Sequence, residues 1–158
     1  MTPAVMAVKK AKIHYDLLEY SHDAAAESYG LEAAEKLALE PDSVFKTLLV
    51  SLTGHRSYLA VAVLPVTHSL SLKAMAKALG AKKAEMADPA VAERSTGYVV
   101  GGISPLGQKK SLPTVIDTTA QLLPLMHISA GRRGLEIALT AKDLATLSRG
   151  IFAQITAE

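Results

Sequence analysis

The stretch Val44-Phe45-Lys46-Thr47-Leu48-Leu49-Val50-Ser51-Leu52 is followed, after Thr53-Gly54-His55-Arg56-Ser57, by an apolar run from Tyr58 to Val66. Two apolar runs joined by a short polar segment that contains glycine are typical of a β-hairpin. The second run has nine residues, whereas a membrane-spanning helix needs roughly 20. We therefore expect a hairpin of two apolar strands and no membrane span.

Capping residues indicate where the helices begin and end. Thr2-Pro3 and Asp88-Pro89 each place a capping side chain before a proline that suits the first helical turn. Thr140 with Asp143 resembles a capping box, and Gly80 suits the left-handed residue that follows a helix. The expected helices are Pro3 to about Lys12, Leu31 to Leu39 closed by Pro41, Leu72 to Leu79, a short helix from Asp88-Pro89, and Thr140 to about Ser148 closed by Gly150.

Further short strands are expected on both sides of this hairpin. They are Ile13 to Tyr20, Tyr98 to Val100, Thr114 to Asp117, a second hairpin from Ile128 to Leu139 that turns at Gly131-Arg132-Arg133-Gly134, and Ile151 to Ile155, with a polar loop over Ser21 to Gly30. No linker, repeat or low-complexity stretch divides the chain, so we expect one domain over residues 1–158. This mixture predicts an α/β (α+β) fold with a mixed, largely antiparallel, barrel-like sheet surrounded by short helices.

The composition excludes several classes of function. The chain has 158 residues, 17 Lys and Arg against 15 Asp and Glu, and no cysteine. The absence of cysteine excludes disulfides, thiolate nucleophiles, iron–sulfur clusters and cysteine zinc sites, and favours a cytoplasmic location. A net charge of +2 is too small for a dedicated DNA-binding protein, so any contact with nucleic acid is expected to be local. The start of the chain lacks signal-peptide features and is expected to belong to the fold.

Other common chemistries are also disfavoured. The five histidines show neither HxxxH nor HExxH spacing, so we expect no metal. No G-x-S-x-G elbow is present, and no complete dinucleotide or phosphate-loop fingerprint occurs, so a nucleotide cofactor is not expected. The basic pairs are most simply a solvated surface, although weak contact with RNA remains open. These pairs are Lys9-Lys10, Lys82-Lys83, Lys109-Lys110 and Arg132-Arg133.

Lys46 is the most informative single residue. Side chains alternate along a strand, so Lys46 shares one face with Val44, Leu48 and Val50 and is the only charge on it. A buried ammonium without a partner costs several kcal/mol, so Lys46 should reach a cleft, meet a carboxylate or have a lowered pKa. The simpler alternative is that its stem lies along the core while its ammonium reaches water.

A glycine-rich loop follows the expected strand at Tyr98 to Val100. Its sequence is Gly101-Gly102-Ile103-Ser104-Pro105-Leu106-Gly107. Glycines let a backbone approach a ligand closely and point its amide groups into a concave site. An ordinary turn fixed by Pro105 explains the same residues equally well.

Three segments resemble one known family. Val44-Phe45-Lys46-Thr47-Leu48-Leu49, Thr96-Gly97-Tyr98 through Gln108-Lys109-Lys110, and Ile128-Ser129-Ala130-Gly131-Arg132-Arg133-Gly134-Leu135-Glu136-Ile137 are similar to the YbaK family of aminoacyl-tRNA trans-editing proteins, in its Cys-tRNA(Pro) deacylase branch. The resemblance runs essentially from end to end and implies a barrel-like mixed sheet with surrounding helices.

The resemblance also implies a set of site residues. Lys46 corresponds to the active-site lysine of the family. The loop that holds the terminal adenosine and its ester corresponds to Gly101, Gly102, Ile103, Ser104 and Pro105, and positions of the substrate pocket correspond to Tyr20, Tyr29, Ser129 and Glu136. Position 29 is often Phe and position 136 often Asp in related sequences, which leaves the pocket size and a Lys46–Glu136 pair open.

The implied activity is hydrolysis of cysteine from Cys-tRNA(Pro), with the substrate thiol attacking its own ester and no cofactor. The implied partners are the acceptor end of tRNA(Pro) and, transiently, prolyl-tRNA synthetase. Two alternatives remain at this point: editing of another amino acid, such as alanine on tRNA(Pro), and a non-catalytic module that binds tRNA ends. Lys46 itself could polarise the ester or, when neutral, act as a general base.

Overall fold

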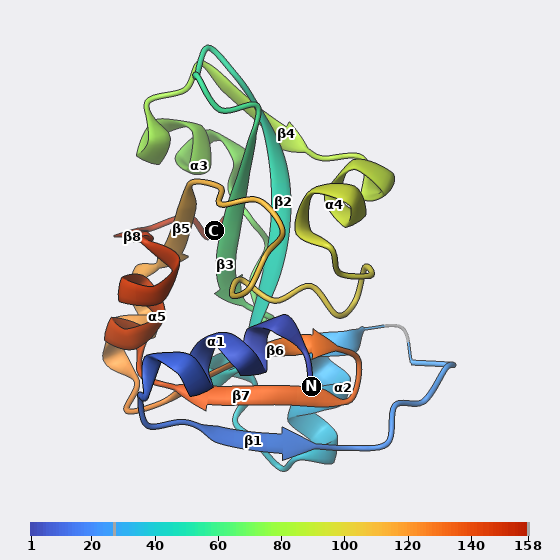
Figure 1. The fold of residues 1–158 in the computed structure, drawn as a ribbon. Coiled ribbons are helices and arrows are strands. Elements are labelled where there is room, and N and C mark those ends of the chain that lie inside the picture. The colour runs from blue at the N-terminus through green and yellow to red at the C-terminus, as the bar shows by residue number, and fades with distance from the viewer. Residues whose placement is uncertain (27, 158) are drawn as a thin grey trace.

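The computed structural model describes residues 1–26 and 28–157, so residue 27 of the expected polar loop lies outside the described residues. The described part contains five α-helices, two short 3₁₀ helices and eight strands (Figure 1). The helices are α1 (Pro3–Ala11), α2 (Tyr29–Lys36), α3 (Leu72–Leu79), α4 (Pro89–Thr96) and α5 (Ala141–Ser148), and the 3₁₀ helices are η1 (Pro41–Ser43) and η2 (Thr118–Leu122). The strands are β1 (Asp16–Glu19), β2 (Phe45–Thr53), β3 (Leu59–Pro65), β4 (Lys83–Met86), β5 (Thr114–Asp117), β6 (Met126–Arg132), β7 (Leu135–Leu139) and β8 (Ile151–Ala153).

The strands form two sheets. The larger sheet has the order β4-β2-β3-β5-β8, in which β4, β2 and β3 are antiparallel and β5 and β8 join in parallel. The smaller sheet has the order β1-β7-β6 and is entirely antiparallel. The fold is therefore mixed α/β with largely antiparallel pairing, as the sequence predicts. The strands divide between two sheets and do not close into one barrel.

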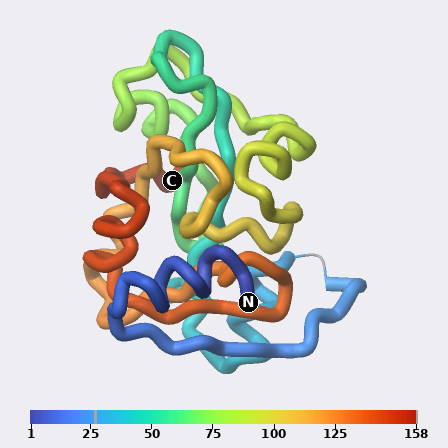
Figure 2. The backbone as a smooth tube through the Cα atoms, in the orientation of Figure 1, coloured from blue at the N-terminus to red at the C-terminus, as the bar shows by residue number. Residues whose placement is uncertain are grey.

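The hairpin β2–β3 contributes side chains to the two largest hydrophobic clusters of the core. Phe45 and Leu49 pack in a cluster with Ile128 and Ile137 of the smaller sheet, whereas Val50 packs with α3 in a second cluster. This split follows the alternation of side chains expected for a strand. In Figures 1 and 2 the hairpin extends from the turn at the top of the molecule down to the smaller sheet.

Most helix boundaries follow the capping residues. The Thr2 hydroxyl accepts a hydrogen bond from the Val5 amide at 3.2 Å, and Ser71, Asp88 and Thr140 cap α3, α4 and α5 in the same way. Gly80 takes the left-handed conformation after α3, with φ of 68°. The capping rules thus located the starts of α1, α4 and α5 and the end of α3 correctly.

The sequence reading of α2 is wrong at both ends. The helix begins at Tyr29 because the Ser28 hydroxyl accepts a hydrogen bond from the Leu31 amide, and it ends at Lys36. Pro41 begins η1 and does not close α2. Similarly, the left-handed residue that ends α5 is Arg149 and not Gly150.

The expected strand from Tyr98 to Val100 is also wrong. Gly97, with φ of 83°, ends α4 and turns the chain sharply. The Val100 amide then donates to a carboxylate oxygen of Glu93 at 2.8 Å, so it makes no strand ladder. A strand that the sequence reading missed, β4, pairs instead with β2 from Val50 to Thr53.

The remaining strands differ from expectation mainly in length. Asp16–Glu19 replaces the longer strand expected from Ile13, and Ile151–Ala153 is shorter than expected. The second hairpin begins two residues earlier, at Met126, and carries a bulge between Ser129 and Arg132. Across residues 1–26 and 28–157, no helix combines the length and the apolar character needed to cross a membrane.

Candidate active site

A cavity of about 410 Å³ opens beside the first half of β2. Its existence follows from the length of β4, which pairs with β2 only from Val50 to Thr53. The Ala87 amide still donates to the Leu49 carbonyl at 3.0 Å, and the chain then leaves for α4. Among the described residues, no strand pairs with the outer edge of β2 from Phe45 to Leu48, and this edge forms one wall of the cavity.

Segments far apart in the sequence form the other walls. They come from the end of β1, the start of α2, the start of α4, the Gly101 loop and the β6–β7 hairpin. The residues that line the cavity are Tyr20, Ser28, Tyr29, Gly30, Phe45, Lys46, Thr47, Leu48, Leu49, Val66, Met86, Ala87, Pro89, Ala92, Val100, Gly101, Ile103, Ser129, Arg133 and Glu136.

Seven of the ten site residues named from the sequence line this cavity: Tyr20, Tyr29, Lys46, Gly101, Ile103, Ser129 and Glu136. Gly102, Ser104 and Pro105 do not. Ser104 is fully buried and braces the loop, because its hydroxyl accepts from the Leu106 amide at 3.2 Å and its carbonyl accepts from the Gln108 side chain at 3.0 Å. Gly102 is packed tightly, since a Cβ there would lie 2.9 Å from the Arg132 Cα.

Lys46 is half-buried on the cavity wall, in agreement with the idea that it reaches a cleft. Within residues 1–26 and 28–157, no carboxylate oxygen lies within 4.0 Å of its Nζ atom, so the Lys46–Glu136 pair that the sequence left open is not formed. Burial without a counter-ion lowers the pKa of Lys46. The ammonium is therefore available to a ligand.

Glu136 places an unusually weak carboxylic acid in the same cavity. It lies on β7 opposite Ser129 and is only 6% exposed. Burial raises the pKa of Glu136 to about 8. Near neutral pH it is therefore mostly a neutral carboxylic acid, which can donate a hydrogen bond to a ligand as well as accept one. Burial similarly raises the pKa of Tyr20.

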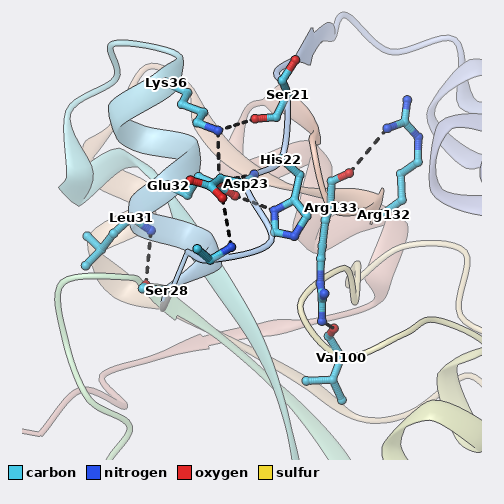
Figure 3. A network of polar contacts seen from close by, with 11 residues as sticks. Ser21, His22, Asp23, Ser28, Leu31, Glu32, Lys36, Val100, Arg132 and Arg133 are labelled. Carbon is cyan, nitrogen blue, oxygen red and sulfur yellow. Dashed lines mark hydrogen bonds and ion pairs between the residues drawn. The ribbon is translucent and has the colours of Figure 1, made fainter.

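Arg133 also lines the cavity, although the sequence-based predictions did not name it as a site residue. Its Nη2 donates to the Val100 carbonyl at 2.7 Å (Figure 3). Its guanidinium lies over the ring of Tyr29, 4.1 Å from the ring centre. Its Nε atom is buried and has no hydrogen-bond partner in the described residues. Arg133 therefore joins the start of α2 to the Gly101 loop and still holds an unused donor.

Gly101 makes this approach possible. It has φ of 91°, and a Cβ at this position would lie 2.6 Å from the Arg133 Nε and 2.7 Å from the Tyr29 ring. Tyr98 anchors the loop, because its hydroxyl donates to the Leu106 carbonyl at 2.6 Å. A glycine is thus required here by conformation and by space.

Thr47 is a second residue that the sequence reading did not select. The Val66 amide donates to the Val44 carbonyl, and the Leu52 amide donates to the Tyr58 carbonyl. The backbone N–H and C=O groups of the even-numbered residues of β2 therefore point toward β3. The backbone N–H and C=O of Thr47 consequently point to the open edge. Its buried hydroxyl also has no partner among the described residues. The alternation of β2 could have revealed the direction of this backbone, but not that β4 stops short of it.

The cavity combines two cationic side chains, a neutral acid, unpaired backbone groups and an apolar floor that includes Phe45 and Leu49. Such a site fits a ligand that has an anionic or ester group and a small apolar part. Among the described residues, no group of three His, Asp or Glu side chains could hold a metal ion.

Comparisons with known proteins agree with this chemistry. The model of the aminoacyl-tRNA editing domain matches residues 24–147, and the chain belongs to this family. Its members act on aminoacyl-tRNA, so the sequence-based inference of an aminoacyl-tRNA editing protein is confirmed at this level.

More specific relatives are also found. A protein of Enterococcus faecalis assigned as a Cys-tRNA(Pro)/Cys-tRNA(Cys) deacylase, EbsC, is 39% identical over 158 aligned positions that cover 98% of this chain and 93% of the relative. A solved structure assigned as a trans-editing enzyme for prolyl tRNA synthetase has a TM-score of 0.82 at 20% identity and covers 100% of this chain and 99% of its own. A hypothetical protein of known structure reaches 0.85 at 20% identity, with 99% and 100% covered. These two structures show the shared fold.

Proposed function

We propose that the chain is a trans-editing hydrolase that removes cysteine from Cys-tRNA(Pro). The observation that carries this proposal is the position of Lys46 and Arg133 around one small apolar cavity beside the open edge of β2. The 39% identical relative assigned as a Cys-tRNA(Pro)/Cys-tRNA(Cys) deacylase supports cysteine as the amino acid.

In the proposed reaction the substrate provides the nucleophile. The cysteine thiol attacks its own ester carbonyl, a C–S bond forms, the C–O bond to the ribose breaks, and the thiol proton passes to the departing ribose oxygen. Water then hydrolyses the released thiolactone. The protein holds the thiol near the carbonyl, and correct placement of an internal nucleophile can lower a barrier by several kcal/mol.

Two groups of the cavity stabilise the charge that develops on the ester. The Lys46 ammonium polarises the ester or the adjacent ribose and phosphate, because no protein carboxylate within the described residues neutralises it. The neutral carboxylic acid of Glu136 donates a hydrogen bond near the amino acid. Tyr20, Tyr29 and Ser129 shape the pocket around the side chain.

This mechanism also explains how proline would be spared. Cysteine and proline are similar in size, so an apolar pocket separates them by only about 1–3 kcal/mol. A reaction that requires a thiol rejects proline regardless of pocket size. Because the chain has a net charge of only +2, we also propose that a transient complex with prolyl-tRNA synthetase supplies tRNA selection.

A panel of charged tRNAs tests the proposal. The purified protein is incubated with Cys-, Ala- and Pro-tRNA(Pro) and with Cys-tRNA(Cys), each with and without prolyl-tRNA synthetase, and ester loss is measured. We expect rapid loss from Cys-tRNA(Pro), and a preference for tRNA(Pro) that increases when the synthetase is present. Faster ester loss from Ala-tRNA(Pro) would show that alanine, and not cysteine, is the amino acid removed. Binding of tRNA without ester loss above background would show a non-catalytic module.

A further inference from the structure

A cluster of lysines lies on the side of the molecule where α3 meets β4. Lys73, Lys77, Lys82 and Lys83 line a single groove of about 480 Å³, and no acidic residue lines it. The other residues that line it are apolar: Leu72, Ala76, Ala81 and Ala84. We call the four lysines the lysine groove.

The local structure explains why residues 73 and 83 come together. Lys73 and Lys77 are four residues apart on α3 and therefore lie on one side of the helix. Gly80 then takes the left-handed conformation, and the Ala81 amide donates back to the Ala76 carbonyl at 2.9 Å. This turn directs the chain back, so that β4, which begins at Lys83, lies beside α3 (Figure 1).

The lysines are exposed and mostly free of acidic neighbours. All four side chains are exposed. Lys83 forms an ion pair with Glu85 at 2.7 Å, and both side chains are more than half exposed, so this pair contributes little. Within residues 1–26 and 28–157, the other three lysines form no ion pair. A protein with a net charge of only +2 thus concentrates four positive charges around one groove.

The groove is connected to the cavity by β4 and by one face of β2. β4 begins at Lys83 in the groove and ends at Met86 on the cavity wall. Three residues of strand span about 10 Å. Lys46 and Leu48 also lie on the face of β2 that α3 covers further along, since Val50 and Leu52 of that face pack with α3.

We propose that the lysine groove binds the phosphate backbone of the tRNA acceptor arm while the aminoacylated end occupies the cavity. This inference rests on the proposed function, because it takes a tRNA end as the ligand of the cavity. The nucleotides before the terminal one must leave the cavity, and β4 leads from the cavity wall to the lysine groove. Lysines that contact phosphate position an RNA without reading its sequence.

A charge-matched pair of variants tests the inference. The first carries Lys73→Gln, Lys77→Gln and Lys82→Gln. The control carries Lys9→Gln, Lys10→Gln and Lys142→Gln, three exposed lysines of α1 and α5 that line neither the groove nor the cavity. Both lose the same charge. Binding of uncharged tRNA(Pro) transcript is measured between 50 and 200 mM salt, and hydrolysis is measured on Cys-tRNA(Pro) and on cysteinyl-adenosine.

With three phosphate contacts, the logarithm of the affinity falls with the logarithm of the salt concentration, with a slope of about −2 to −3. We therefore expect the groove variant to lose that part of the slope. When the salt is raised from 50 to 200 mM, the affinity of the wild type for tRNA should fall about 20-fold more than the affinity of the groove variant. The control variant should retain the wild-type slope. On cysteinyl-adenosine, which has no acceptor arm, both variants should match the wild type.

Each other result has a distinct meaning. Equal tRNA affinity and salt dependence in the two variants would overturn the inference, even if the protein is an active deacylase. A groove variant that keeps its tRNA affinity but loses binding to prolyl-tRNA synthetase would also overturn it and assign the groove to a protein partner. If the wild type cleaves neither ester, the proposed function fails, and the tRNA-binding arm still decides whether the groove binds RNA.

Discussion

The guanidinium of Arg133 lies 4.1 Å from the ring centre of Tyr29 and donates a 2.7 Å hydrogen bond to the Val100 carbonyl. This contact links the β6–β7 hairpin, the start of α2 and the Gly101 loop, which are three walls of the cavity. We therefore expect the shape of the cavity to depend on a side chain that the sequence-based predictions did not name as a site residue.

Arg133→Ala should lower kcat/KM for Cys-tRNA(Pro) by about tenfold, because it removes a cation–π contact and a charge-assisted hydrogen bond that hold the cavity wall. Arg132→Ala is the matched control. The Arg132 side chain is exposed, pairs with the exposed Glu19 and donates a long hydrogen bond to the Arg133 carbonyl at 3.5 Å, so we expect a change of less than about twofold. Equal steady-state kinetics of the two variants would show that the Arg133 contact does not shape the site.

Lys46→Ala should lower kcat by about 100-fold or more while the protein stays folded, because the substitution removes the cation proposed to polarise the ester. Circular dichroism checks the fold. Lys46→Arg distinguishes the two roles of the lysine. A fixed cation is partly restored by arginine, whereas a general base is not, because arginine keeps its proton at accessible pH. Wild-type activity in Lys46→Ala would remove Lys46 from the mechanism.

Glu136→Gln should change how stability depends on pH. Burial raises the pKa of Glu136 from 4.5 to about 8 in the folded protein, so the folded state binds this proton more tightly than the unfolded state. The contribution of this protonated carboxyl to the free energy of unfolding is fully present below pH 4.5 and is lost as pH rises through about 8. Between pH 5 and 9, urea unfolding should show that the wild type loses about 3–5 kcal/mol more than Glu136→Gln. Parallel pH curves would mean that Glu136 titrates normally.

Glu32 anchors the loop before α2, and its removal should destabilise the protein in the opposite pH range. Burial disfavours its charge, but hydrogen bonds from His22, from the Asp23 amide and from Lys36 outweigh this and hold the pKa of Glu32 at about 2 (Figure 3). Its stabilising effect is therefore present above pH 4.5 and is lost as pH falls through about 2.

We expect Glu32→Ala to lower the free energy of unfolding by about 2–3 kcal/mol at pH 7, and by much less at pH 2. Glu35→Ala, on the same helix but without a side-chain hydrogen bond or ion pair in the described residues, is the control. A loss of the same size in both variants would mean that helix propensity, and not the hydrogen bonds to His22 and Asp23, explains the effect.

The sequence predicted the elements whose signals are local. The hairpin of β2 and β3 follows from two apolar runs around a polar turn, and the start of α1 follows from Thr2 and Pro3. A capping hydrogen bond forms within one turn of helix, so a few neighbouring residues decide it. The place of Lys46 on a wall could be anticipated for the same reason, because alternation along a strand is also a local property.

The predictions from sequence were wrong where pairing between distant segments determines the secondary structure. Tyr98 to Val100 has the composition of a strand, yet Gly97 redirects the chain and Glu93 takes the Val100 amide. β4 has two charged and two apolar residues and lacks the β-branched and aromatic residues typical of strands, but it is held by pairing with β2. A strand exists only where a partner satisfies its backbone, and the partner is chosen by the whole fold.

The amino-acid sequence by itself determined the class of fold, because periodicity and capping are properties of neighbouring residues, and its resemblance to the family named seven residues that the structure places on the cavity wall. Only the tertiary structure decided that β4 ends early and leaves the edge of β2 open, and that Arg133 joins Tyr29 to Val100. It also decided that Glu136 is buried and forms no ion pair within residues 1–26 and 28–157. These features depend on which distant groups meet in space, and on how far burial removes them from water, and neither is encoded in the spacing of residues along the chain.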